Sequence, residues 1–162
     1  METNRSKIKI WSIILGIVGY VVLCFPWYEL TSEASILGYT ASMSAGEIIG
    51  LSAAGQSFLG YGLYVIPALI IAVGCGKIGK NMIMRKKSMT VGILGIVEVI
   101  CLLIVDTEMA SYATDNSGFG ASASAGFTSL GGYSIALIAY VLTAIVGFVL
   151  MFKTPEDLEE EE

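Results

Sequence analysis

The sequence predicts an all-α membrane protein, a bundle of four transmembrane helices with a small extracellular cap built from two related loops. Three observations support this prediction. Of the 162 residues, 55% are hydrophobic and only 14% are charged, whereas an average soluble domain has about 25% charged residues. The apolar residues gather in four long runs. The basic residues occur only before the first run, between the second and third, and after the fourth.

Each apolar run is long enough for a membrane helix. The runs occupy residues 10–27, 58–76, 89–105 and 133–152. A helix needs about 20 apolar residues to cross the hydrocarbon layer, with roughly 17 to 25 as the usual range. Three runs contain no charged residue, and the third contains only Glu98. Core helices of a soluble protein would carry a polar face, which these runs lack.

The basic residues set the expected orientation. Short loops rich in Lys and Arg stay in the cytoplasm. We therefore expect a multi-pass plasma-membrane protein with both termini and the loop at 77–88 in the cytoplasm. The loops at 28–57 and 107–132, which contain no Lys or Arg, are then outside. Residues 1–152 form one membrane domain, and residues 153–162 form an acidic cytoplasmic tail.

The first outer loop carries local structural signals. Ser44 and Glu47 stand three positions apart before an apolar stretch, which is typical of a capping box at the start of a helix. Residues 34–43, just before it, favour a strand or hairpin. In the second outer loop, the Ala/Ser/Gly-rich stretch at 121–126 favours a loop over a strand.

Two sequence repeats indicate an internal duplication, with halves at about 10–76 and 89–152. The pentapeptide I-L-G-I-V occurs twice at an offset of 79 residues. A Gly/Ala/Ser-rich nonapeptide recurs at an offset of 80 with six identical positions. Because each half starts and ends inside, the halves would be related by about half a turn around the membrane normal.

The duplication also predicts where the nonapeptides lie. They occupy residues 38–46 and 118–126, at equivalent places in the cap, and are candidates for side-by-side strand pairing. Their small side chains would let another backbone approach closely. The candidate assembly positions are Ser42, Ser44, Ser122 and Ser124.

The composition argues against most catalytic chemistry. The chain contains no histidine, which removes the commonest general base and the commonest metal ligand. Its three cysteines have no base beside them in the sequence. We expect no enzymatic activity, no cofactor and no metal site. The basic residues serve topology, so we expect no nucleic-acid binding. No pattern in the sequence leads us to infer a small-molecule ligand.

Glu98 lies near the middle of the third run and is the one ionisable carboxyl within the four runs. A charged carboxylate at that depth costs roughly 2.5–3.5 kcal/mol, so we expect the neutral acid, which donates one hydrogen bond. Tyr20, Tyr140 and Thr143 lie at similar depth and are the candidate partners. Three interpretations stay open: an acid that locks the bundle, a proton or cation site, and a contact between subunits.

The layout resembles small bacterial four-span membrane proteins with no assigned role and, more broadly, the claudins. The shared features are a longer first outer loop and cytoplasmic termini. The claudin signature, a Trp followed by Gly-Leu-Trp and two cysteines in the first loop, is absent, and only Trp27 is comparable. The resemblance therefore implies a layout and transfers no claudin function.

The leading hypothesis for function is structural. We expect a non-enzymatic membrane protein, embedded in the lipid bilayer, that forms a homo-oligomer or serves as a subunit of a larger membrane complex. The alternative is a cation channel or transporter component that uses Glu98 and the acidic outer face.

Overall fold

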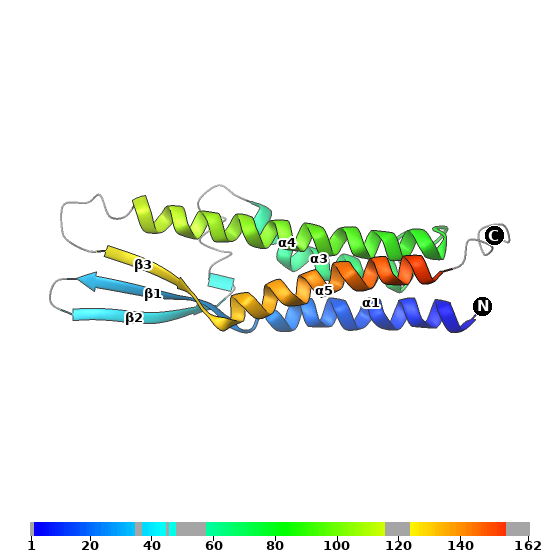
Figure 1. Cartoon of the computed structure of the whole chain (residues 1–162), viewed down its shortest axis with the longest axis horizontal. Coiled ribbons are helices and arrows are strands. Elements are labelled where there is room, and N and C mark those ends of the chain that lie inside the picture. The colour runs from blue at the N-terminus through cyan, green and yellow to red at the C-terminus, as the bar shows by residue number, and fades with distance from the viewer. Residues whose placement is uncertain (1, 35–36, 45, 48–57, 116–123, 155–162) are drawn as a thin grey trace.

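The protein is mostly helical, with a small sheet at one end. The computed structural model describes residues 2–34, 37–44, 46–47, 58–115 and 124–154. The helices lie side by side along the long axis of the molecule, and the strands extend from one end of the bundle (Figure 1). The elements are α1 (Glu2–Val22), β1 (Pro26–Ala34), β2 (Leu37–Ser44), the 3-10 helix η1 (Phe58–Tyr61), α3 (Gly62–Gly74), α4 (Met84–Asp115), β3 (Ser124–Ser129) and α5 (Gly131–Lys153).

All four apolar runs of the sequence contribute to helices, but these helices differ in length and composition. Within the described residues, the two that are long and apolar enough to cross a membrane are Met84–Glu108 of α4 and Gly131–Lys153 of α5. The apolar helix α3 has 13 residues. The 21 residues of α1 include Arg5, Lys7 and Lys9 near its start. Two of the four helices therefore have the length and composition of a membrane span.

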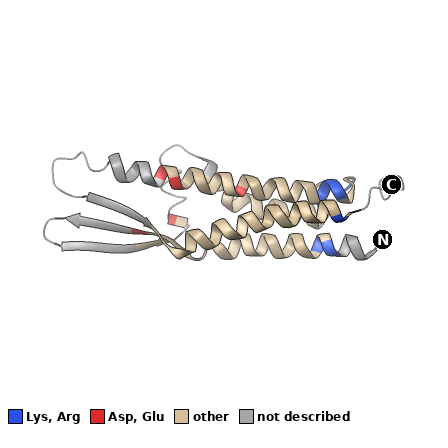
Figure 2. Cartoon of the chain, in the orientation of Figure 1, with Lys and Arg blue, Asp and Glu red and all other residues tan. Residues whose placement is uncertain are grey.

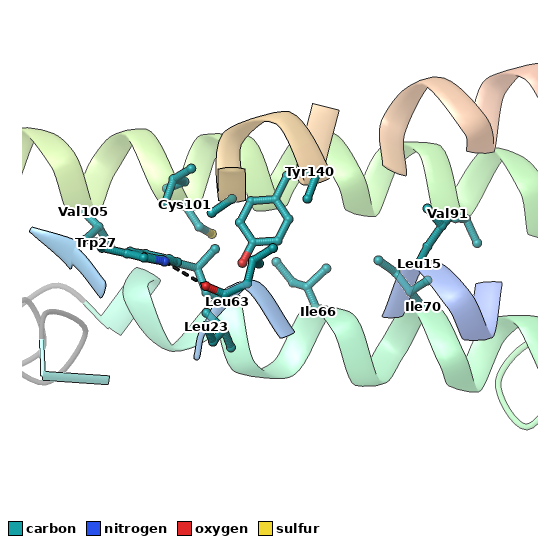
Figure 3. Close-up of a cluster of buried hydrophobic side chains, with 14 of the residues drawn as sticks. Leu15, Leu23, Trp27, Leu63, Ile66, Ile70, Val91, Cys101, Val105 and Tyr140 are labelled. Carbon is teal, nitrogen blue, oxygen red and sulfur yellow. Dashed lines mark hydrogen bonds between the residues drawn. The ribbon is translucent and has the colours of Figure 1, made fainter. Parts of the chain in front are cut away.

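Large apolar side chains cover the outside of the bundle as well as its interior. The interior cluster brings together Leu63 and Ile70 of α3 with Cys101 of α4 and Tyr140 of α5 (Figure 3). On the outside, exposed apolar side chains follow helical spacing along α1. Helices α3, α4 and α5 also expose large apolar side chains. In α5, only 28% of the most apolar 18-residue stretch is buried inside the bundle. Exposed apolar surface on this scale marks contact with a membrane or with another protein.

Glycines allow the helices to approach closely within two pairs, α1 with α3 and α4 with α5. A Cβ added at Gly95 of α4 would lie 2.5 Å from the backbone nitrogen of Ala144 in α5. A Cβ added at Gly16 of α1 would lie 2.8 Å from the carbonyl oxygen of Pro67 in α3. Small residues at these positions let helix backbones meet directly, as in membrane helix pairs.

The sheet has the strand order β2-β1-β3, and both pairings are antiparallel. Where the sequence favoured a strand or hairpin at 34–43, the structure has strand β2, and its hairpin partner β1 begins at Pro26, before that range. The loop expected at 121–126 is wrong from Ser124 onward, where β3 begins. Because only two residues connect β1 to β2, these strands become neighbours, and β3 takes the other side of β1.

This order contradicts the expected side-by-side pairing of the two nonapeptides. Their described parts, residues 38–44 and 124–126, lie on opposite sides of β1 and in different registers. Gly38 and Ser124 are both paired with Glu33, whereas Ser44, the repeat equivalent of Ser124, pairs with Pro26 at the other end of β1. The nonapeptides therefore do not occupy equivalent places in the sheet.

Helix α4 is longer than the sequence predicted at both ends. It begins at Met84, inside the expected loop at 77–88, and ends at Asp115, inside the expected loop at 107–132. The segment beyond the apolar run contains Glu, Met and Ala, which have high helix propensity. The outer end of α4 therefore remains helical where the first half of the chain, after α1, becomes the strand β1.

Candidate functional site

Glu98 lies in the interior of the bundle and is almost completely buried. Its exposed fraction is 1%. Neither carboxyl oxygen has a hydrogen-bond partner among the described residues. Most buried polar atoms in proteins are hydrogen-bonded, and each exception calls for an explanation, such as a bound ion or water. This carboxyl group is therefore the strongest candidate for a functional position in the bundle.

The surroundings of Glu98 come from all four helices. A Cβ added at Gly19 of α1 would lie 3.5 Å from Glu98 Oε1 and 2.9 Å from Pro67 Cγ in α3. Cys101, one turn further along α4, and Tyr140 of α5 lie within electrostatic range of Glu98. The missing side chain at Gly19 leaves room for the carboxyl group at the place where the helices meet.

Tyr140 is the second buried polar group without a partner. Its side chain projects into the interior cluster, with the hydroxyl toward Leu63 (Figure 3). That hydroxyl has no hydrogen-bond partner among the described residues. The same small region thus contains two unpartnered polar groups, Tyr140 and Glu98, which together offer one phenolic proton and a carboxyl group.

The other two expected partners of Glu98 form hydrogen bonds elsewhere. Tyr20 donates to the carbonyl oxygen of Tyr64, at 2.9 Å. Thr143 is buried as expected, but it donates to the carbonyl oxygen of Ala139 at 3.0 Å, the usual bond of a helical threonine to the preceding turn. None of the three expected partners, Tyr20, Tyr140 and Thr143, therefore forms a hydrogen bond with Glu98 in this structure.

The helix α3 adds an acceptor to this region. Pro67 has no N–H, so a proline inside a helix leaves the carbonyl oxygen four residues earlier without its helical donor. That residue is Leu63, which is fully buried. The Lys and Arg residues of the described chain gather at the end of the bundle away from the sheet (Figure 2). Within the described chain, the basic side chains therefore lie away from Glu98, at the other end of the bundle from the sheet.

A second polar cluster lies where the bundle meets the sheet. The Tyr28 hydroxyl donates to Asp106 Oδ1, and the indole of Trp27 donates to the carbonyl oxygen of Val22 at 3.0 Å. The ring of Tyr133 packs against both aromatic rings. Burial, together with the bond to Asp106, raises the pKa of Tyr28 above its ordinary value of 10.0. The sequence analysis missed this link, because the two residues are 78 positions apart.

The expected assembly positions have different roles. Ser42 is exposed on β2, and Ser124 begins β3. The backbone nitrogen and hydroxyl of Ser44 both donate to Glu47 Oε2 at 2.8 Å, and the Glu47 nitrogen donates to Ser44 Oγ at 3.4 Å. These bonds are those of the predicted capping box, and they lower the pKa of Glu47. Ser122 and the expected helix after Glu47 lie outside the described residues.

The fold and these sites define a mostly helical protein in which two apolar helices are compatible with a membrane location. Comparison with protein-family models, curated proteins and solved structures gave no match. The buried carboxyl, the sheet and the charge distribution therefore carry the functional inference.

Proposed function

We propose that the protein is a non-enzymatic multi-pass membrane protein that assembles with further copies of itself through the outer sheet. In this proposal all four helices lie in the bilayer and both termini are cytoplasmic. Basic residues gather at the end of the bundle away from the sheet, and acidic residues lie nearer the sheet (Figure 2). This distribution supports a cytoplasmic position for the basic end, because Lys and Arg favour the cytoplasmic side.

The observation that carries the proposal is the outer edge of β2. In the sheet order β2-β1-β3, β2 has β1 on one side and no further described strand on the other. Natural edge strands are usually protected by charged residues or proline, and β2 contains neither. An edge of this kind can add a strand from another chain.

The composition of β2 favours a second copy as the occupant of this edge. The strand contains glycine, alanine and two serines, so two such backbones can approach closely. Its lack of charge also removes like-charge repulsion between copies at the contact itself. The apolar outer faces of the helices would then contact lipid, which is consistent with assembly outside the bilayer.

A charge placed on β2 tests the assembly. Ser42→Lys should convert the oligomer into single chains, because an edge lysine opposes strand addition. Ser129→Lys, at an exposed position of the other edge strand β3, distinguishes assembly through β2 from assembly through β3, and it should leave the oligomer intact. Masses are measured for the full chain in mild detergent and in nanodiscs. A wild-type protein that is monomeric in both media would overturn the proposal.

The membrane topology needs a separate test. In a variant with the three native cysteines replaced, Ser42→Cys should react with an impermeant thiol reagent on intact cells. Lys80→Cys, at the basic end, should react only after the membrane is opened. Reaction of Lys80→Cys on intact cells would contradict the proposed orientation.

A second candidate function, a component of a proton or cation path, is favoured by the unpartnered carboxyl of Glu98. An ionisable residue within a membrane bundle is expensive and commonly functional. Glu98→Gln keeps the shape and cannot ionise. It should abolish pH-driven proton or cation flux in liposomes, while the exposed control Glu47→Gln keeps it. Unchanged flux in Glu98→Gln would leave only a structural role for Glu98.

A further inference from the structure

A pocket opens at the basic end of the bundle, away from the sheet. Its volume is about 300 Å³. The lining comes from α1, the end of α3, the turn after it and the first turns of α4, and it includes Lys9, Gly76, Lys80, Met84 and Lys87. The pocket therefore lies between three helices and is separate from the region around Glu98.

The pocket has an unbalanced positive charge. Three of its lining residues are lysines and none is acidic. Lys87 is only 8% exposed, although lysine is almost never buried without a partner. The side chain of Lys87 is therefore largely buried in the pocket wall, and among the described residues its ammonium group has no carboxylate partner. An anion in the open pocket would supply that partner.

The backbone adds to this positive potential. Helix α4 begins at Met84, in the pocket lining. The first N–H groups of a helix have no partner within the helix and carry a partial positive charge. Ile83, just before the helix, has no side-chain oxygen to cap them, and the first turn contains no acidic residue. The lysines and the helix start therefore favour the same kind of ligand.

We propose that this pocket binds a phosphate group, either that of an anionic phospholipid headgroup or that of a free phosphate ester. Lysine ammonium groups each provide three donors, and a helix start is a ready anion site. Gly76 has a φ of +72°, and a Cβ there would meet no atom within 4 Å, so the turn beside the pocket carries no side chain that could close it. In the proposed topology the pocket lies at the cytoplasmic surface, where anionic lipids are concentrated.

The first experiment distinguishes Lys87 from its neighbour. Lys87→Met keeps the apolar stem and removes the charge, and Lys86→Met makes the same change at an exposed position outside the pocket lining. Retention of phosphatidylglycerol, with phosphatidylcholine as reference, is measured by native mass spectrometry of the full chain. We expect Lys87→Met to weaken retention by about tenfold or more, the loss of one charged hydrogen bond, and Lys86→Met to leave it unchanged.

The second experiment identifies the source of the phosphate. Glycerol 3-phosphate is titrated against lipid-free protein in mild detergent, and the thermal shift is recorded. Binding in this arm shows that the phosphate group suffices, whereas binding only in the lipid arm assigns the site to a headgroup. Lys87→Arg, which keeps the positive charge, should bind as the wild type does in whichever arm shows binding. Equal results for Lys87→Met and Lys86→Met in both arms would overturn the proposal.

These outcomes are independent of the proposed assembly. The start of α4, which lines the lysine pocket (the pocket with Lys9, Lys80 and Lys87 in its wall), and strand β2 lie at opposite ends of the molecule (Figure 1). A monomeric wild type would overturn assembly through β2 and leave the phosphate site standing. If Lys87→Met had no effect on phosphate binding while Ser42→Lys still dissociated the oligomer, the phosphate site would be overturned and the assembly would stand.

Discussion

The two halves of the molecule pack alike inside the bundle and differ outside it. In the first half, Gly16 of α1 meets Pro67 and Ile71 of α3. In the second half, Gly95 of α4, its repeat equivalent, meets Thr143 and Ala144 of α5. The shared pentapeptide thus brings its glycine against the following helix in both halves. The repeated sequence is therefore matched by a repeated helix contact.

Beyond the bundle the halves separate where α1 ends, because α1 stops at Val22 whereas its aligned residue, Cys101, lies inside α4. The offset of 79 aligns Pro26 with Val105. Proline cannot continue a helix, and the chain becomes β1 at Pro26. Val105 allows α4 to continue to Asp115. The comparison teaches that apolar packing constrains both helix pairs, whereas each outer segment follows its own sequence.

The largest effect is expected at the glycine contacts, where the halves differ in what a new Cβ would meet. At Gly95 it would meet the backbone of Ala144 and Thr143, and at Gly16 it would meet the movable side chain of Ile71 and one carbonyl oxygen. Gly95→Ala should cost about 2–3 kcal/mol of unfolding free energy and Gly16→Ala about 1 kcal/mol. Unfolding in mixed detergent and dodecyl sulfate micelles measures both. Equal costs would remove the distinction between the pairs.

Glu98 and Gly19 occupy equivalent positions in the repeat and face each other in the bundle. If the unpartnered carboxyl is a cost to the fold, Glu98→Leu should raise the unfolding free energy by about 1–3 kcal/mol. Glu98→Gln, which stays polar, should give a smaller change. The same unfolding assay applies. A destabilised Glu98→Leu protein would mean that the carboxyl contributes a hydrogen bond to the native bundle.

The bond between Tyr28 and Asp106 joins β1 of the first half to α4 of the second. Tyr28→Phe should cost about 1–2 kcal/mol, because Asp106 loses its donor. The pKa of Tyr28 is raised in the folded protein, so this stabilisation is complete below pH 10 and falls as the pH rises above it.

The pH dependence gives that prediction a second measurement. Wild-type stability in a base-resistant detergent should decline above about pH 10 more steeply than that of Tyr28→Phe. Tyr61→Phe, at an exposed position, is the control and should keep the wild-type slope. An unchanged slope in Tyr28→Phe would show that another group titrates.

The smallest effect concerns a feature of the first half alone. The capping bonds of Ser44 to Glu47 lower the pKa of that exposed carboxyl, whereas the offset of 80 places Phe127 where Glu47 would recur. Ser44→Ala removes the hydroxyl donor and keeps the backbone N–H, which is the larger cause, so it should raise the Glu47 pKa only part of the way toward 4.5. Carbon-13 NMR of labelled glutamate measures the titration, with Ser42→Ala as the control. An unchanged Glu47 pKa would assign the whole shift to the backbone N–H of residue 44.

The parts of this fold that were predictable from sequence depend on local patterns. The apolar runs contribute to helices, as their length and their lack of a polar face predicted. The bond between Ser44 and Glu47 was predictable because it spans three residues. The hairpin of β1 and β2 was partly predictable, since its strands are adjacent in the chain. The helix-favouring residues after Val105 were compatible with a longer α4, but the sequence analysis expected an outer loop in that segment.

The parts that were missed depend on contacts between distant segments. Tyr28 and Asp106 are brought together by the packing of β1 near α4, which no local pattern encodes. Strand β3 lies beside β1 because β2 occupies the other side of β1. The sequence of β3 alone does not encode this neighbour. The lysine pocket combines α1, the turn after α3 and α4, and the sequence showed only basic residues near span ends. Glu98 was identified by composition, but its lack of a partner required the tertiary structure.

Helix α4 has a mechanical consequence. Its 32 residues span about 48 Å at the usual helical rise, more than the roughly 30 Å of hydrocarbon. The lysine pocket is at its start, Glu98 is near its middle, and Asp106 is at the sheet. The described helix is continuous through all three, so it acts as a stiff lever. A tilt of the whole helix would therefore move its sheet-side end and its Lys87 end together.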